Sequence, residues 1–347
     1  TLIPEIAPEQ YITLSSTAVN ANPWSFDDKQ LIDIKTRLLQ SGCFGDYATV
    51  KVGIQVLWDK AYHIRPTSVA SGIIKGKSHT EEDIEIELAA CRPLICNENF
   101  YAYRKDFADV FVIFPYDVVD GGVSEILFSD FTRRFPRAGA YLTRNKGTIE
   151  AAVETLPKKF PEKYTDEYWH LFTRVQNHGA TYPKILVPMT ALDTFATITL
   201  SDNTYCDNAN VFFIEAPEKD EITLYALSAV INSTIYSVLA RSIANPQSNG
   251  YFKFNKQFLE PVPFPCQKFI DNIELKTQLA EAAKRIEDLQ NKFIGGSPNQ
   301  QRTFANLLLT QWNILDNLCY QLYDLTADEI AFFNGRGRNV NRIESIN

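Results

Sequence analysis

The spacing of hydrophobic positions predicts a mixed protein of helices and strands that ends in long helices. Near the start, Leu31, Ile34 and Leu38 recur every three or four residues and predict a helix over 28–41. From about residue 45 to 215, short apolar and β-branched runs alternate with turn residues, as in strands. The predicted strands are 50–57, 60–65, 110–114, 184–188, 195–200 and 210–215.

Helical spacing also predicts helices among and after these strands. The shorter ones cover 80–91, 130–134 and 138–153. A longer one, 222–243, is apolar on more than one face, so we expect it to be buried. After it, Pro261, Pro263 and Pro265 alternate, which favours an extended chain over a helix or a central strand. We therefore place a domain boundary after residue 265.

Two long amphipathic helices are predicted beyond that boundary, over 267–293 and 299–323. Only a short loop separates them, and Ser297 is a good N-cap for the second, so the pair should form an antiparallel hairpin. Thr326 and Glu329 have the spacing of a capping box and predict one more short helix.

These patterns indicate an α+β fold in two parts. A mixed-sheet domain covers 1–265, and the helical hairpin with a C-terminal tail covers 266–347. The chain begins with Thr1 and has its only methionine at Met189, so we interpret it as a fragment of a longer protein. The sequence contains no run of about 18 apolar residues, so it predicts no membrane-spanning helix. Six scattered cysteines favour a reducing, cytoplasmic setting.

The net charge of −8 disfavours nucleic acid as a partner only mildly, because affinity depends on where positive charge gathers. Residues 131–163 hold eight basic and three acidic side chains, a local net charge of +5. A second basic cluster contains Arg336, Arg338 and Arg342 near the C-terminus. An ordinary solvated surface remains the alternative interpretation of both clusters.

Motifs of known catalytic chemistry are absent from the sequence or occur in the wrong context. The Glu-x-Lys pattern of metal-dependent nucleases occurs at 274–276, inside a predicted helix. The four histidines lack the spacing of metal ligands, and no Gly-x-Ser-x-Gly elbow occurs. We expect this chain to be non-catalytic. An enzyme that uses carboxylates dispersed along the chain remains an alternative.

Several short segments follow one another in a specific order, namely 53–62, 135–137, 183–185, 251–265 and 322–330. Together they resemble the TaqI-like C-terminal specificity domain of type II restriction–modification adenine methyltransferases. The chain departs from the family pattern at Val56 and Leu57, where threonine and glycine are usual.

The resemblance implies a target-recognition domain that reads double-stranded DNA beside an adenine-N6 methyltransferase domain. That partner domain would precede Thr1 in the longer polypeptide, and some relatives also carry a nuclease. S-adenosylmethionine would bind the missing domain, so we expect no cofactor in this chain. The nearest match to the Asn/Asp-Pro-Pro-aromatic base loop of such enzymes is 22–25, which has one proline only.

The candidate DNA-binding residues have side chains that suit phosphates or base edges. Lysine and arginine donate to phosphates and guanine, whereas glutamine and asparagine bind adenine with two hydrogen bonds. Seven of the candidates lie in segments that carry the resemblance, namely Gln55, Lys60, Arg137, Lys184, Lys253, Asn255 and Lys256. Lys184 also begins a buried-looking strand. The candidates are Gln55, Lys60, Arg133, Arg137, Arg144, Lys146, Lys184, Lys253, Asn255 and Lys256. A protein–protein scaffold remains a third interpretation of the chain.

Overall fold

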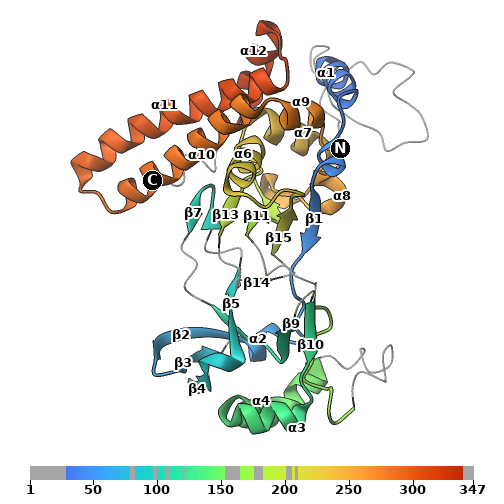
Figure 1. Cartoon of the computed structure of the whole chain (residues 1–347), viewed down its shortest axis with the longest axis vertical. Helices are drawn as coiled ribbons and strands as arrows, with labels where there is room; N and C mark the ends of the chain where they lie inside the picture. Colours follow the sequence, from blue (N-terminus) through green and yellow to red (C-terminus); the bar gives the residue numbers. More distant parts are fainter. Residues whose placement is uncertain are drawn as a thin grey trace, which may run out of the picture.

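The fold is α+β, as the sequence predicts, with two main sheets, several smaller ones and long C-terminal helices (Figure 1). The computed structural model describes residues 29–78, 83–96, 100–105, 110–119, 122–152, 165–175, 183–200, 205–207 and 210–338. Within these ranges the buried hydrophobic side chains form two separate clusters. One cluster is carried by the elements at the bottom of Figure 1, such as β2 (His63–Ala70), β3 (Ile73–Ser78), β4 (Asp83–Glu87) and α4 (Pro136–Ala152), and is called the lower core. The other is called the upper core.

The lower core is built on a six-stranded sheet in the order β14-β5-β8-β2-β3-β4. Its strand β14 runs parallel to β5, whereas the other paired strands are antiparallel, so the sheet is mixed. The strands are β2 (His63–Ala70), β3 (Ile73–Ser78), β4 (Asp83–Glu87), β5 (Cys91–Ile95), β8 (Phe111–Ile113) and β14 (Tyr205–Cys206).

Helices α3 (Phe128–Arg134) and α4 (Pro136–Ala152) complete the lower core. The carboxylate of Glu87 accepts hydrogen bonds from the amides of Arg137 and Ala138, at 2.9 and 3.0 Å, and so caps the first turn of α4. The remaining elements of this part are α2 (Asp59–Tyr62), η4 (Leu88–Ala90), β9 (Tyr116–Val119) and β10 (Gly122–Glu125).

The upper core surrounds a four-stranded antiparallel sheet in the order β1-β15-β11-β13. Its strands are β1 (Thr49–Val52), β11 (Lys184–Pro188), β13 (Thr197–Thr199) and β15 (Val211–Glu215). Two small sheets belong to the same part of the structure. One pairs β6 with β7, and the other has the order β12-β17-β16. Their strands are β6 (Phe100–Tyr101), β7 (Arg104–Lys105), β12 (Thr190–Ala191), β16 (Asn245–Pro246) and β17 (Phe252–Lys253).

Helices near both ends of the described chain contribute to the upper core. Helix α10 packs against its hairpin partner α11 and also against α6, so the hairpin contributes to the upper core. The boundary after residue 265 stays a prediction, but helices on both sides of it share one core. The helical elements are α1 (Lys29–Leu39), η3 (Phe44–Asp46), α6 (Glu221–Ile231), α7 (Thr234–Ile243), η7 (Ser248–Gly250), α8 (Lys256–Leu259), α9 (Cys266–Asp271), α10 (Ile273–Ile294), α11 (Pro298–Leu322) and α12 (Ala327–Arg336).

Two predicted helices are each interrupted by a polar capping residue. The expected helix 222–243 is the pair α6 and α7, because the Ser233 hydroxyl accepts from the amide of Tyr236 and starts a new helix. The expected helix 267–293 is divided into α9 and α10, because the side chain of Asn272 accepts from the amide of Leu275. Short polar side chains compete with the helical hydrogen bonds at such positions and favour caps.

The predicted helix over 80–91 is wrong, because residues 83–87 form strand β4 and 91–95 form β5. The sequence Asp-Ile-Glu-Ile-Glu alternates polar and apolar residues, with Ile84 and Ile86 buried, which is the two-residue period of a strand. Conversely, part of the predicted strand 60–65 is helical, since α2 covers Asp59–Tyr62. The predicted strand 50–57 ends earlier, at Val52.

No single helix among the described residues is long and apolar enough to cross a membrane. Helices α6 and α7 reach that length and composition only together, and the pair is bent by 63°. Their side chains lie largely in the upper core of the protein.

Burial of α10 against α6 generates a stability prediction. Leu279 is fully buried on α10, whereas Leu307 on α11 is 43% exposed. Replacing Leu279 by alanine removes buried methyl groups and leaves a cavity, so we expect a loss of about 2–5 kcal/mol in urea unfolding. The control Leu307→Ala should change the free energy of unfolding by no more than about 0.5 kcal/mol. Equal effects of the two variants would contradict the packing of the hairpin into the upper core.

The side chain of His170 makes the lower core sensitive to acid. The imidazole is fully buried beside the rings of Phe128 and Phe131, with centroids at 5.0 and 5.5 Å. Burial lowers the pKa of His170 from its ordinary 6.5 to about 4. The unfolded chain therefore binds more protons than the folded chain between these two pH values.

Folding stability should consequently decrease as the pH falls from about 6.5 to about 4, with a contribution from His170 of up to about 3 kcal/mol. A His170→Phe variant should lack that contribution. The measurement is urea unfolding at several pH values. A variant that loses stability as steeply as the parent chain would show that another group is responsible.

Candidate nucleic-acid interface

Four of the cations predicted on α3 and α4 are on the surface but are paired with carboxylates. Each has a partner acid outside 131–163, and Lys146 also has Glu150 at 3.9 Å, so the local charge of +5 does not describe the folded surface. Exposed ion pairs contribute only about 0–1 kcal/mol, and a phosphate can replace the carboxylate. The pairs are Arg133–Asp130, Arg134–Asp117, Arg137–Glu85 and Lys146–Asp166.

Arg137 has a structural role at the start of α4. Its guanidinium pairs with Glu85 of β4, while its backbone amide donates to Glu87 two residues further along that strand. Hydrogen bonds from Lys75 and then from Arg137 lower the pKa of Glu85. Both interactions fasten α4 to β4. The other candidate on α4, Arg144, is exposed and lies over the ring of Tyr141 at 5.9 Å.

Gln55 and Lys60 lie where the chain leaves β1 and enters the lower core. The backbone of Gln55 pairs with that of Arg174 in both directions, at 2.8 and 3.2 Å, and leaves its side chain exposed. Lys60 is exposed on α2, between Asp59 and His63. These two candidates are therefore accessible, and they lie on the lower core with the candidates of α3 and α4, whereas Lys184, Lys253, Asn255 and Lys256 lie on the upper core.

Lys184 does not belong to a DNA-binding surface. It begins β11 in the upper core, has no exposed area and lies 5.9 Å from the ring centroid of Phe213. A side chain without accessible surface cannot contact a phosphate in this conformation. Its position agrees with the strand-entry interpretation, and we leave it out of the interface.

An exposed segment rich in amide side chains contains strand β16 and the turn that leads from it to β17. It is called the amide loop and comprises residues 245–251, all of them exposed. The backbone is left-handed at Asn249 and Gly250, with φ of 58° and 78°, conformations that asparagine and glycine accept more readily than other residues. The loop presents Asn245, Gln247 and Asn249 between two paired strand ends.

The C-terminal basic cluster packs against this loop. The guanidinium of Arg338 lies 5.4 Å from the ring centroid of Phe252 and donates to the carbonyl of Gly250 at 3.2 Å. Arg241 donates to the carbonyl of Arg336 at 2.7 Å. The sequence shows the segment around Phe252 and the C-terminal arginines as separate features. It does not show that they are in contact, because more than 80 residues separate Phe252 from Arg338. Arg342 lies outside the described residues.

Positive charge is concentrated here because acids are scarce. Residues 242–259 contain no aspartate or glutamate. Burial, and secondarily the charge of Arg338, lower the pKa of Arg241, while its ion pair with Asp193 acts in the opposite direction. Arg338 is therefore exposed beside the amide loop, whereas Arg241 is buried and paired with Asp193, and the two guanidinium groups are close enough to influence each other.

The three sequence candidates of this region differ in accessibility. Lys253 is half-buried on β17, opposite Thr190. Lys256 is exposed and pairs with Glu260 at 3.5 Å. Asn255 precedes α8, and its Oδ1 is buried without a hydrogen-bond partner among the described residues, so that oxygen does not face solvent.

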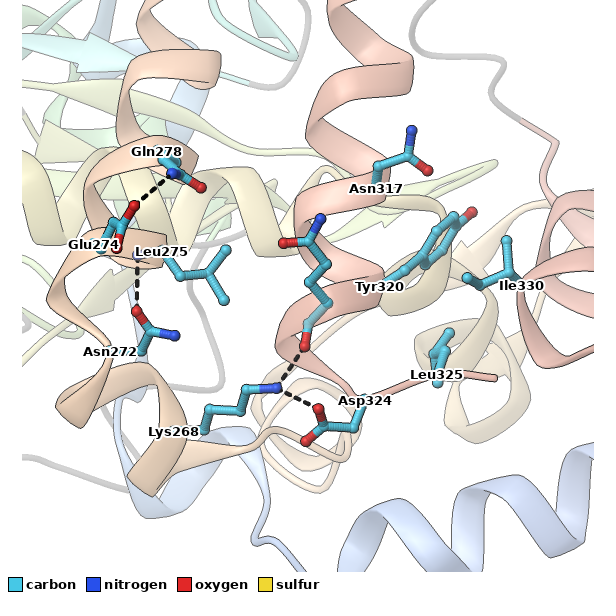
Figure 2. Close-up of a pocket in the computed structure, with 11 residues that line it drawn as sticks. Lys268, Asn272, Glu274, Leu275, Gln278, Asn317, Tyr320, Asp324, Leu325 and Ile330 are labelled. Atoms are coloured by element: carbon cyan, nitrogen blue, oxygen red, sulfur yellow. Dashed lines mark hydrogen bonds and ion pairs between the residues drawn. The ribbon is translucent and has the colours of Figure 1, made fainter. Parts of the chain in front are cut away.

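A groove of about 780 Å³ lies at the end of the helical hairpin opposite its connecting turn, between the start of α10 and the end of α11 (Figure 2). Lys268 donates to the Gln321 carbonyl and to Asp324, at 2.5 and 2.6 Å. Glu274 accepts from Gln278 at 3.3 Å. The charged side chains on its walls therefore already have hydrogen-bond or ion-pair partners. Among the described residues that line the groove, no nucleophilic side chain lies beside a base.

No family model and no curated protein matches this chain. The resemblance to the TaqI-like specificity domain therefore stays a hypothesis, carried by the sequence segments alone.

The buried pair of Arg241 and Asp193 should hold the base of the amide loop in place. Their side chains are 10% and 5% exposed. Replacing Asp193 by alanine leaves a buried guanidinium without its counter-ion, so we expect a loss of about 3–5 kcal/mol in urea unfolding. The control Asp166→Asn, whose side chain is 98% exposed, should change stability by no more than about 0.5 kcal/mol. Equal effects would mean that the pair adds nothing to folding.

Proposed function

We propose that this chain is the DNA target-recognition module of a restriction–modification adenine-N6 methyltransferase and that the amide loop reads base edges. The observation that carries the proposal is the exposed, acid-free loop flanked by the cations of β17 and of the C-terminal segment. The sequence resemblance supplies the kind of enzyme. The loop supplies the chemistry of recognition.

The shape of the loop suits a DNA groove. The major groove is about 12 Å wide and accepts a two-stranded β-ribbon. The loop ends in a hairpin of two such strands, since Pro246 of β16 pairs with Phe252 of β17, and β12 adds a third strand on the far side of β17. The side-chain amides of Asn245, Gln247 and Asn249 can donate to N7 of adenine and accept from its N6 amino group. Without DNA, the Gln247 amide donates to the carbonyls of Asn245 and Pro246 at 3.4 and 3.1 Å.

The cations next to the loop suit the phosphates on either side of a groove. Lys253 and Arg338 lie at the base of the ribbon, and phosphate contacts of this kind position a protein on DNA without reading its sequence. The net charge of −8 repels DNA elsewhere on the surface. We therefore expect this chain alone to bind duplexes weakly, with a dissociation constant of about 10⁻⁴ to 10⁻⁶ M.

The proposal assigns chemistry to a methyltransferase domain outside this chain. That domain would bind S-adenosylmethionine and take the target adenine out of the base stack. The hairpin offers apolar side chains for docking, because Leu307, Leu309 and Ile314 on α11 are each at least 43% exposed. A cytoplasmic setting fits this role and the six free cysteines.

Duplex binding should depend on the cations beside the amide loop. We expect the double variant Lys253→Ala, Arg338→Ala to weaken binding to a random-sequence duplex and to reduce the log–log salt slope by about two. Fluorescence anisotropy at several salt concentrations measures both quantities. The matched control is Lys284→Ala, Lys292→Ala on α10, which removes the same charge from exposed sites far from β17 in sequence.

Base reading is tested separately with Gln247→Ala and Asn249→Gly, because glycine accepts the left-handed backbone at position 249. Selection from a randomised duplex pool should enrich a motif with the parent chain and lose about 1–3 kcal/mol of preference at one base pair with the variants. Their salt slope should not change. Absence of binding at low salt would overturn the proposal and favour a protein–protein scaffold.

A further inference from the structure

Three side chains with metal-binding chemistry converge where the chain passes between the two cores. Asp59 and His63 lie one helical turn apart, at the start of α2 and directly after it. Asp207 arrives from a distant segment, because its residue forms a parallel bridge with Ile54. One ligand atom from each of the three side chains lies within 4.8 Å of the others.

The geometry suits a single cation. Bonds of about 2.0–2.2 Å to oxygen and nitrogen place two ligands of one metal about 3–4 Å apart. Ligand atoms within 4.8 Å of one another are close to this spacing. One imidazole and two carboxylates favour a first-row transition metal over Mg²⁺ or Ca²⁺, which prefer oxygen ligands alone.

Burial gives the cluster a closed and an open side. His63 and Asp207 are 3% and 6% exposed, whereas Asp59 is exposed and leaves a path from solvent. The side-chain amide of Asn210 donates to Oδ2 of Asp207 at 2.6 Å. Such a contact orients a ligand from behind, as the outer hydrogen bonds of metal sites commonly do.

The position of the cluster indicates what a cation would do there. Residues 53–58 connect β1 of the upper sheet with α2 of the lower core, and 207–210 connect β14 of the lower sheet with β15 of the upper one. The two connections are held together by the hydrogen bond from the Ile54 amide to the Cys206 carbonyl, at 2.8 Å. One ion would therefore be coordinated by ligands from both connections.

We propose that Asp59, His63 and Asp207 bind a first-row divalent cation, of the class of Mn²⁺ or Zn²⁺, that clamps these two connections. The clamp stabilises the folded chain because the unfolded chain does not bring Asp207 to the other two ligands. This proposal is independent of DNA binding, since no residue of the amide loop takes part.

The test uses the full chain after treatment with a chelator. Mn²⁺ is the probe, because the free thiols of this chain compete for Zn²⁺ more strongly than for Mn²⁺. Electron paramagnetic resonance counts the unbound Mn²⁺ in a titration. We expect one ion per chain and a melting temperature that rises with Mn²⁺ concentration.

The variant Asp59→Asn removes an exposed ligand without disturbing either core, and we expect it to weaken Mn²⁺ binding at least tenfold and to abolish the rise in melting temperature. Asp166→Asn removes a charge from a side chain that is 98% exposed, and it should bind like the parent chain. Absence of a stoichiometric site in the parent chain would overturn the proposal. So would equal affinities of the parent chain and Asp59→Asn.

Discussion

The chain crosses repeatedly between two hydrophobic cores, and the rest of the structure depends on these crossings. The upper core contains Leu31 and Phe333, so it is assembled from both ends of the chain. The ribbon β6–β7 belongs to it as well, since the ring of Tyr103 lies 5.7 Å from that of Trp312. Neither core is one continuous stretch of sequence. A core of this kind forms only after distant segments have met, which is slow for contacts of large sequence separation.

Local patterns predicted the elements whose burial follows one simple period. The strands β11 and β15 and the hairpin of α10 and α11 fall in this class, because uninterrupted apolar runs or stripes specify them. The misassigned strand β4 has a two-residue period over only five residues, too short to distinguish from a helical stripe by eye. The bend at Ser233 depends on a single hydroxyl whose capping role becomes evident only in three dimensions.

The candidate site was less predictable than the fold, because electrostatics depends on neighbours that sequence does not reveal. The cations of α3 and α4 looked uncompensated until folding supplied acids such as Asp117 and Glu85 from other elements. Lys253 and Arg338 are separate features of the sequence, and folding places Arg338 against Phe252, the neighbour of Lys253 on β17, and against the Gly250 carbonyl. Counting charges along the chain therefore overestimated the positive charge on the surface of α3 and α4. It also treated the cations of β17 and of the C-terminal segment as two unrelated features.

The amide loop is fixed at its ends and contributes none of its own side chains to either core. Its backbone conformation requires tolerance of positive φ at Asn249 and Gly250, but positions such as Asn245 and Gln247 face solvent and pack against nothing in the upper core. Substitutions at exposed positions of this kind usually change stability by less than about 0.5 kcal/mol. The loop can therefore diverge in sequence between related proteins at almost no cost to folding. The buried pair of Arg241 and Asp193 beneath it cannot.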